Sequence, residues 1–141
     1  MADFSRHEER IMALKILYGL DIREELVFDR AEREIENFKR KKDFVIKQEK
    51  EYYFEKLIYG VIKKKEKLDK FINKFAEGWT VDRMAHVDRN ILRIALFEME
   101  EEENVPPAVA VDEAVELAKK FASEKTSSFI NGILSRSDKF D

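Results

Sequence analysis

The sequence predicts an all-α protein, and three observations support this fold class. Charged residues make up 40% of the chain, well above the usual quarter, and hydrophobic residues make up 44%. Only four glycines and two prolines interrupt the 141 residues. Apolar residues recur at spacings of three and four, which is typical of helices buried along one face. We expect six or seven helices in a single domain over residues 1–141.

The first half of the chain shows four apolar stripes. Ser5-Arg6-His7-Glu8 matches a capping box, so a first helix should run from about residue 6 to residue 20. A second stripe runs from Phe28 to Phe38, and the basic segment 39–43 should end that helix and begin a loop. Two more stripes, within 54–62 and 68–75, stay in phase across a lysine-rich segment. They predict either one long helix or two helices that meet there.

A central buried helix should follow Gly78. Thr80 is its expected cap, and its apolar residues extend to Met99. We interpret the acidic residues 98–103 as the solvated end of this helix rather than as a metal site, and Pro106-Pro107 as its stop.

The chain should end in two shorter helices. The first spans residues 111–121, and Thr126 or Ser127 should cap the second. The last helix contains the poor helix formers Asn131 and Gly132. We expect Gly132 to let another helix pack closely, and Asn131 to be either a structural amide or a residue that faces a ligand.

Composition argues against several classes of protein. The chain has no cysteine, which rules out disulfides, thiolate catalysis and cysteine-bound zinc. Its two histidines form no catalytic pattern, and its four glycines form no phosphate-binding loop. We therefore expect a binding protein rather than an enzyme, with no cofactor and no metal. No apolar leader or membrane span is visible in the sequence, so we expect a cytoplasmic location.

Charge is distributed unevenly along the chain. Residues 1–36 hold 6 basic and 10 acidic side chains, residues 37–75 hold 13 and 6, and residues 76–141 hold 8 and 14. The basic middle segment predicts either a local anion-binding surface or merely solvated helix faces. RNA recognition combines such cations with aromatic faces, and Phe75, beside the Gly78-Trp79 bend, should be partly exposed.

Several strings together resemble the family of the transcription antitermination protein NusB. They are RIMALKILYGLD (10–21), GWTVDRMAHVDRNILRIALFEME (78–100) and VPPAVAVDEAVELAKKFASEKTSSFINGIL (105–134). The strings keep the order and spacing of the family's motifs. The resemblance is specific from 78 to 134 and weaker from 22 to 70.

The resemblance implies both a fold and a role. The fold is two packed helical bundles, and the role is transcription antitermination without catalysis. Family members pair with NusE, a ribosomal protein, bind single-stranded boxA RNA and help RNA polymerase read through terminators. Two alternatives stay open: the NusB-like accessory domain of an RNA cytosine methyltransferase, and a self-associating helical protein, for which a homodimer is possible.

The resemblance also implies a set of binding residues. In Arg6-His7-Glu8-Glu9-Arg10, only two arginines remain of the arginine cluster that precedes the family's first helix. Phe129 matches the family's RNA-contacting aromatic residue, although a core position is the alternative for it. Asp88 matches a partner-binding position, although it could equally complement the helix dipole. The predicted RNA-binding residues are Arg6, Arg10, Tyr18, Phe75, Lys125, Phe129 and Asn131, and the predicted NusE-binding residues are Tyr18 and Asp88.

Overall fold

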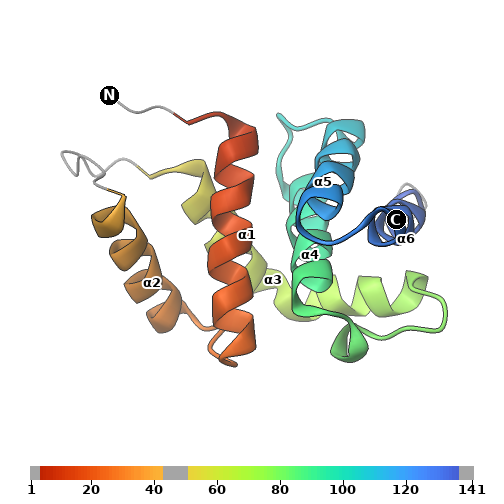
Figure 1. The fold of residues 1–141 in the computed structure, drawn as a ribbon, viewed down its shortest axis with the longest axis horizontal. Coiled ribbons are helices and arrows are strands. Elements are labelled where there is room, and N and C mark those ends of the chain that lie inside the picture. The colour runs from red at the N-terminus through yellow and green to blue at the C-terminus, as the bar shows by residue number, and fades with distance from the viewer. Residues whose placement is uncertain (1–3, 43–50, 137–141) are drawn as a thin grey trace. The chain divides into compact units, whose positions relative to one another are not determined.

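A computed structural model describes residues 4–42 and 51–136. These ranges contain helices joined by turns and loops, and they contain no strand (Figure 1). They form six α-helices and one short 3-10 helix, which confirms the predicted all-α class of six or seven helices. The chain divides into two compact units, residues 1–63 and residues 64–141. No helix in the described ranges is both long and apolar enough to cross a membrane.

The first unit begins with the predicted capping box. Helix α1 (Arg6–Ile22) starts after Ser5, whose hydroxyl accepts the Glu8 amide at 3.0 Å. The Glu8 carboxylate accepts the Ser5 amide at 2.8 Å in return. Helix α2 (Phe28–Lys41) follows after a turn and ends within the basic segment 39–43, as predicted, and Asp43 lies outside the described residues. The core of this unit contains Ala13, Leu14, Leu17, Leu20, Ala31, Ile35, Phe54, Leu57, Ile58 and Val61.

Helix α3 (Tyr53–Phe75) is one continuous helix, which decides between the two alternatives left by the sequence. Its lysine-rich middle does not break it, because Lys65 forms an ion pair of 3.3 Å with Asp69 one turn later. The boundary between the two units falls inside this helix, so α3 contributes its first turns to one unit and its last turns to the other.

The second unit enters its central helix later than the sequence predicts. The chain first makes a 3-10 turn, η1 (Val81–Arg83), and α4 (His86–Glu101) begins after Ala85. The expectation that the Thr80 side chain caps the helix is wrong, because that side chain makes no capping hydrogen bond. Instead the Val81 amide donates to Asn73 Oδ1 at 2.7 Å, so α3 holds the turn. Helix α4 is buried from Asn90 to Glu98, as its apolar sequence predicts.

Helices α5 (Pro107–Phe121) and α6 (Glu124–Leu134) pack on α4 and on each other. The cap of α6 is Ser123, whose hydroxyl accepts the Thr126 amide at 3.0 Å, so the prediction of Thr126 or Ser127 places the start one turn too late. Thr126 and Ser127 instead form the first turn of the helix, where Ser127 is buried.

A buried ion pair joins α3 to α4 in the second unit. The Arg93 guanidinium is 1% exposed and donates to both carboxylate oxygens of Asp69, at 2.8 and 3.0 Å. A third bond, of 3.0 Å, runs from Arg93 to Asn90 Oδ1. This bidentate geometry offsets the cost of burying the charge.

The acidic end of α4 is less solvated than expected. Glu98 and Glu102 are buried, at 1% and 8% exposure. Glu100 and Glu101 form ion pairs with Lys67 and Lys64 of α3, at 3.0 and 3.5 Å. The interpretation of 98–103 as a solvated helix end is therefore wrong for Glu98 and Glu102, whereas Glu101 and Glu103 are exposed as expected.

Candidate RNA- and partner-binding surfaces

The two N-terminal arginines of α1 gather around one aromatic ring in the first unit. The Arg6 guanidinium carbon lies 3.7 Å from the centre of the Tyr53 ring, and that of Arg10 lies 6.0 Å from it. Arg6 is exposed, so its cation remains accessible to an anion. Arg10 is only 4% exposed, which favours a structural role for it over a phosphate contact.

The glutamates that interrupt the arginine cluster have structural roles. Glu8 completes the capping box of α1. Glu9 is buried, and its Oε1 accepts the Phe54 amide at 3.0 Å, which satisfies a free donor at the start of α3. Sequence reasoning missed this contact because the two residues are 45 positions apart.

A shallow hollow in the second unit brings together two of the predicted RNA-binding aromatics. Phe75 from the end of α3 and Phe129 from α6 both line this space of about 230 Å³. Both rings are half-buried, so neither belongs wholly to the core. Trp79 is 50% exposed, and its ring meets Phe129 edge-on with centres 6.4 Å apart. We call Phe75, Trp79 and Phe129 the aromatic hollow.

Cations surround the aromatic hollow. Lys125 is exposed and precedes Phe129 by four residues, so the two share one face of α6. Lys74 Nζ lies 5.4 Å from the centre of the Phe75 ring. Arg136 lines the hollow and donates a hydrogen bond to the Phe75 carbonyl. Glu77 also lines the hollow, and its carboxylate lies 3.8 Å from the Arg136 guanidinium and compensates part of that charge. The arrangement offers flat apolar faces beside positive charge, which suits an unstacked base and its phosphate.

Asn131 and Gly132 lie on the exposed side of α6. A Cβ added to Gly132 would meet nothing within 4 Å, so the expectation that this glycine permits close helix packing is wrong. Gly132 instead lines the aromatic hollow, where the missing side chain leaves space. Asn131 is exposed, and its side chain forms no hydrogen bond to a described residue, which favours a residue that faces a ligand over a structural amide.

Tyr18 belongs to an exposed apolar patch on the first unit. It is 41% exposed, and Ile22, Val27 and Phe28 around the turn from α1 to α2 are between 47% and 53% exposed. The Phe28 ring stacks on Tyr59 of α3 with centres 6.0 Å apart. Neighbouring exposed apolar side chains of this kind suit a protein partner.

Asp88 lies in the first turn of α4, in the second unit. Its carboxylate is half-buried and has no hydrogen-bond or ion-pair partner among the described residues. Burial raises the pKa of Asp88 above its usual value, even though the start of a helix favours negative charge. A carboxylate left in this state is available to a donor from another molecule.

The fold and these surfaces define a helical binding protein with separate aromatic, cationic and apolar surfaces. Within the described residues, no three histidine, aspartate or glutamate side chains gather as a metal site would require. A NusB family model matches residues 7–139, and the chain belongs to this family.

Individual relatives agree with that assignment. The chain is 50% identical over 133 residues to the transcription antitermination protein NusB of Halothermothrix orenii, covering 94% of this chain and 96% of the relative. It is 36% identical to the Bacillus subtilis protein of the same name over 130 residues, with 92% of each chain covered.

Solved structures share the fold. A crystal form of T. maritima NusB superposes with a TM-score of 0.77 at 30% identity, covering 98% of this chain and 93% of that one. A complex of antitermination factors NusB and NusE with double-stranded RNA contains a chain that superposes with a TM-score of 0.78 at 27% identity, covering 98% and 100%.

Proposed function

We propose that this chain is a transcription antitermination factor that binds boxA-type RNA together with NusE and acts on RNA polymerase without catalysis of its own. The observation that carries the proposal is the aromatic hollow, where Phe75 and Phe129 meet beside Lys74, Lys125 and Arg136. Family membership and the NusB–NusE–RNA complex among the similar structures support it.

The RNA is bound by stacking and by charge. A base stacks on Phe129 or Phe75, and Lys125 neutralises a neighbouring phosphate. Asn131 offers an unpaired amide on the same helix for a base edge. In the first unit, Arg6 supplies a further cation at the start of α1.

NusE docks through surfaces that this chain leaves unpartnered. In the first unit these are Tyr18 and the exposed apolar side chains near it, which would be buried on binding. In the second unit Asp88 receives a donor from NusE, which compensates its half-buried carboxylate. A homodimer would compete for such surfaces, so dimer formation should weaken as NusE is added.

The relatives favour this function over the methyltransferase alternative. The H. orenii and B. subtilis proteins, which match over 96% and 92% of their own length, are both transcription antitermination proteins. Bacterial transcription takes place in the cytoplasm, so this function implies a cytoplasmic location.

Fluorescence anisotropy with a labelled boxA-type RNA tests the proposal. We expect the single-stranded boxA RNA to bind more tightly than a scrambled RNA, and NusE to strengthen that binding. A double-stranded RNA of the same sequence should be titrated as well, because the structurally similar NusB–NusE complex contains double-stranded RNA. Equal binding of boxA and scrambled RNA, with and without NusE, would contradict the proposal.

A matched pair of variants tests the aromatic hollow. Phe129→Ala should weaken RNA binding by about 1–3 kcal/mol, because a stacked base loses its platform. Phe121→Ala is the control, since Phe121 is also half-buried in the second unit and also lies near a lysine, with Lys120 Nζ at 5.6 Å, but is not part of the hollow. Circular dichroism must first show that both variants are folded. Equal affinities of the two variants would rule out stacking on Phe129.

A further inference from the structure

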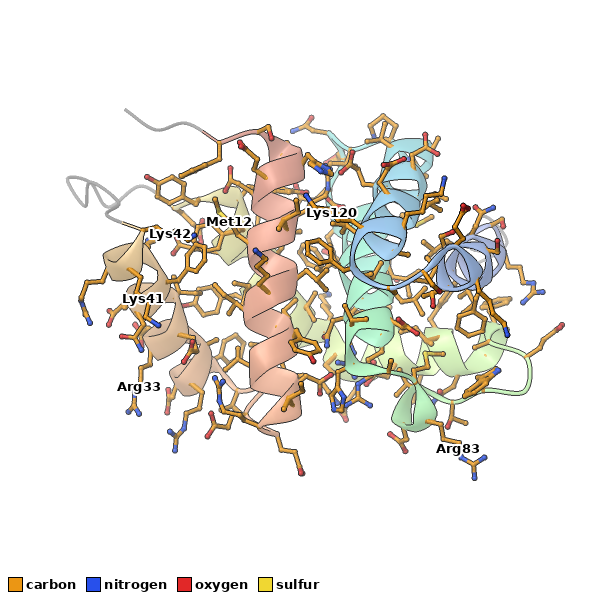
Figure 2. All side chains as sticks on the ribbon, viewed as in Figure 1. Met12, Arg33, Lys41, Lys42, Arg83 and Lys120 are labelled. Carbon is orange, nitrogen blue, oxygen red and sulfur yellow. The ribbon has the colours of Figure 1, made fainter. Side chains whose placement is uncertain are left out.

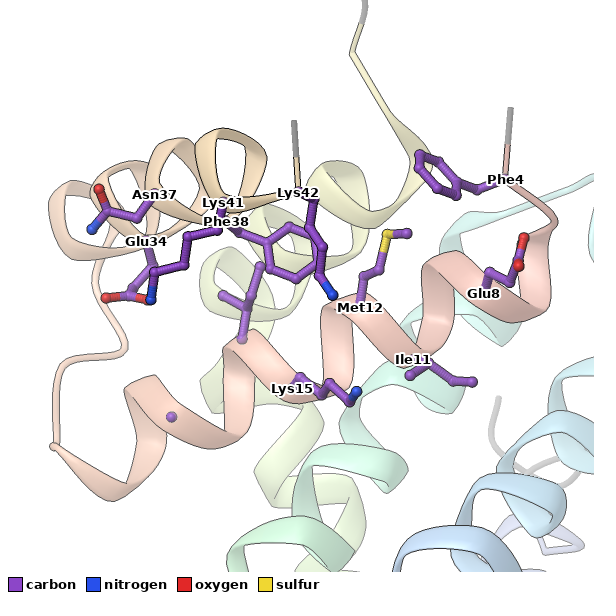
Figure 3. Close-up of a pocket in the computed structure, with 12 residues that line it drawn as sticks. Phe4, Glu8, Ile11, Met12, Lys15, Glu34, Asn37, Phe38, Lys41 and Lys42 are labelled. Atoms are coloured by element: carbon purple, nitrogen blue, oxygen red, sulfur yellow. The ribbon is translucent and has the colours of Figure 1, made fainter. Parts of the chain in front are cut away.

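A groove of about 670 Å³ lies between α1 and α2 in the first unit, and the residues that line it differ from those predicted to bind RNA or NusE. Figure 3 shows Met12 rising from α1 into the space between Phe38 of α2 and Phe4. The function proposed above makes no use of this groove. Its volume is in the range of a binding site rather than of a packing defect.

The floor of the groove is apolar and adaptable. Ile11, Met12 and Ile16 come from successive turns of α1, and Phe38 faces them from α2. Ile11, Met12 and Phe38 are each only half-buried, so apolar surface remains open to a ligand. The flexible thioether of Met12 can adjust to the shape of what binds. Gly19 lines the same groove further along α1, where an added Cβ would lie 3.4 Å from Nη1 of Arg23.

The rim of the groove is basic. Lys15 comes from α1. Lys41 is the last residue of α2 and Lys42 follows it, and both are labelled with Met12 in Figure 2. All three are exposed, and none forms an ion pair with a described carboxylate. The rim therefore presents three positive charges to whatever occupies the groove.

The two acidic residues that line the groove do not cancel this charge locally. The Glu8 carboxylate is held by the Ser5 amide at 2.8 Å in the capping box. Glu34 forms an ion pair of 3.3 Å with Arg23, which is not part of the groove. Both carboxylates have partners, whereas the three lysines have no carboxylate partner in the part of the chain that the structure describes.

We propose that this groove binds a short amphipathic helix of a partner protein, one that has two or three apolar anchors and acidic residues beside them. Anchors at i, i+4 and i+7 fit an apolar groove between two helices. Flanking carboxylates match Lys15, Lys41 and Lys42 and set the orientation of the peptide. An RNA occupant is less suitable, because the floor is mainly aliphatic and offers few flat faces for base stacking.

Methyl NMR on the full chain tests the proposal, with the methionine methyl groups labelled with carbon-13. The probe is a synthetic peptide of about four helical turns, with leucines at i, i+4 and i+7 and glutamates beside them. A peptide of the same composition in scrambled order is its control. The Met12 signal, assigned through Met12→Leu, should shift saturably with the amphipathic peptide. Met84 and Met99, in the second unit, should not shift.

A matched pair of triple variants tests the basic rim. Lys15→Glu/Lys41→Glu/Lys42→Glu should weaken peptide binding by about tenfold or more, because like charges then face each other. The control reverses three other exposed lysines, Lys63→Glu/Lys70→Glu/Lys119→Glu, with the same change in net charge. It should change the affinity by less than about twofold, since distant exposed charges are screened.

Four results would overturn the proposal. They are no Met12 shift with the peptide, an equal shift with the scrambled peptide, a shift caused by single-stranded RNA alone, and a shift that depends only on protein concentration. The third would identify an RNA site and the fourth a contact between two copies of the chain. None of them bears on the aromatic hollow, so the antitermination proposal is tested independently.

Discussion

At the scale of single residues, two glycines differ in whether the structure requires a glycine at their position. Gly132 lies in α6 with open space where a Cβ would be, so nothing in the described structure requires its small size for packing. Gly78 has a φ of +80°, a left-handed conformation that other residues adopt only with strain. The same substitution should therefore have opposite effects at the two positions.

Gly132→Ala should raise the free energy of unfolding by about 1 kcal/mol, because alanine favours a helix more than glycine does. Gly78→Ala should lower it by about 1–2 kcal/mol, because of the left-handed backbone. Urea unfolding followed by circular dichroism measures both. If the hollow takes a base, Gly132→Ala should also weaken RNA binding while stabilising the fold. A destabilised Gly132→Ala would mean that the space beside this residue is not open.

The error over Gly132 has a physical explanation that the sequence already contained. The apolar residues Phe129, Ile130, Ile133 and Leu134 lie on one arc of the last helix, and Gly132 falls outside this arc. The helical spacing of these apolar residues therefore already distinguished the packed face of the last helix from its open face. The partial exposure of Phe129 could not be predicted, because it depends on Phe75 and Trp79 from another part of the chain.

Asp88 should make stability depend on pH. Burial raises its pKa in the folded state, so the folded protein binds a proton more readily than the unfolded chain does. Stability from this group is therefore greatest below the unfolded pKa of about 4 and falls as pH rises through the folded value. Asp88→Asn should unfold at a higher urea concentration than the parent at pH 7, and the difference should shrink towards pH 4. A variant less stable than the parent at pH 7 would mean that the charge is favourable where it lies.

At the scale of elements, the periodicity of apolar residues was enough to predict which segments are helical. Where each helix begins and ends depended on contacts between residues distant in the sequence. The continuity of α3 could not be decided from its own sequence, because polar lysines fit both a helix and a turn. The ion pair between Lys65 and Asp69 and the pairs from Lys64 and Lys67 to α4 explain the outcome. The late start of α4 depends on Asn73, which no local pattern links to Val81.

The strongest prediction about an element concerns the ion pair between α3 and α4. Asp69→Ala should lower the free energy of unfolding by about 3–5 kcal/mol, because the buried Arg93 guanidinium would lose both of its hydrogen bonds to the Asp69 carboxylate. Lys65→Ala is a suitable control, since Lys65 contacts the same carboxylate from an exposed position and should cost less than about 1 kcal/mol. Similar losses in the two variants would show that the buried guanidinium is not the source of the effect.

At the scale of the whole molecule, part of the positive charge of the basic middle segment (residues 37–75) is already paired with carboxylates. Its described lysines are shared between the two units, and Lys39, Lys64, Lys65 and Lys67 form ion pairs with carboxylates. Counting charge along the sequence could not reveal this, because each partner carboxylate comes from another turn or another helix. The single domain predicted from the sequence stays a prediction, because the division into two compact units does not test it.

RNA binding should accordingly depend only moderately on salt. Each phosphate neutralised by a cation contributes about 0.7 to the slope of log affinity against log salt for a single strand. Lys125→Ala should reduce the slope by about that amount and weaken binding to all RNA sequences alike. Lys120→Ala, on the neighbouring helix α5, is the control. The measurement is anisotropy at several salt concentrations, and equal slopes for the two variants would exclude a phosphate contact at Lys125.

The segment that begins α1 combines a proposed RNA-binding role with structural roles of Glu8 and Glu9, and this restricts how the protein can evolve. A lineage under selection for tighter RNA binding would gain charge most directly by replacing Glu8 or Glu9 with arginine. The first change would open the cap of α1, and the second would leave the Phe54 amide unsatisfied and bury an arginine where a carboxylate now lies. Mutations towards an arginine-rich start thus carry a fitness cost from misfolding. Adaptation should proceed more readily through new cations at exposed positions, of which Lys125 is an existing example, or through stronger cooperation with a partner protein.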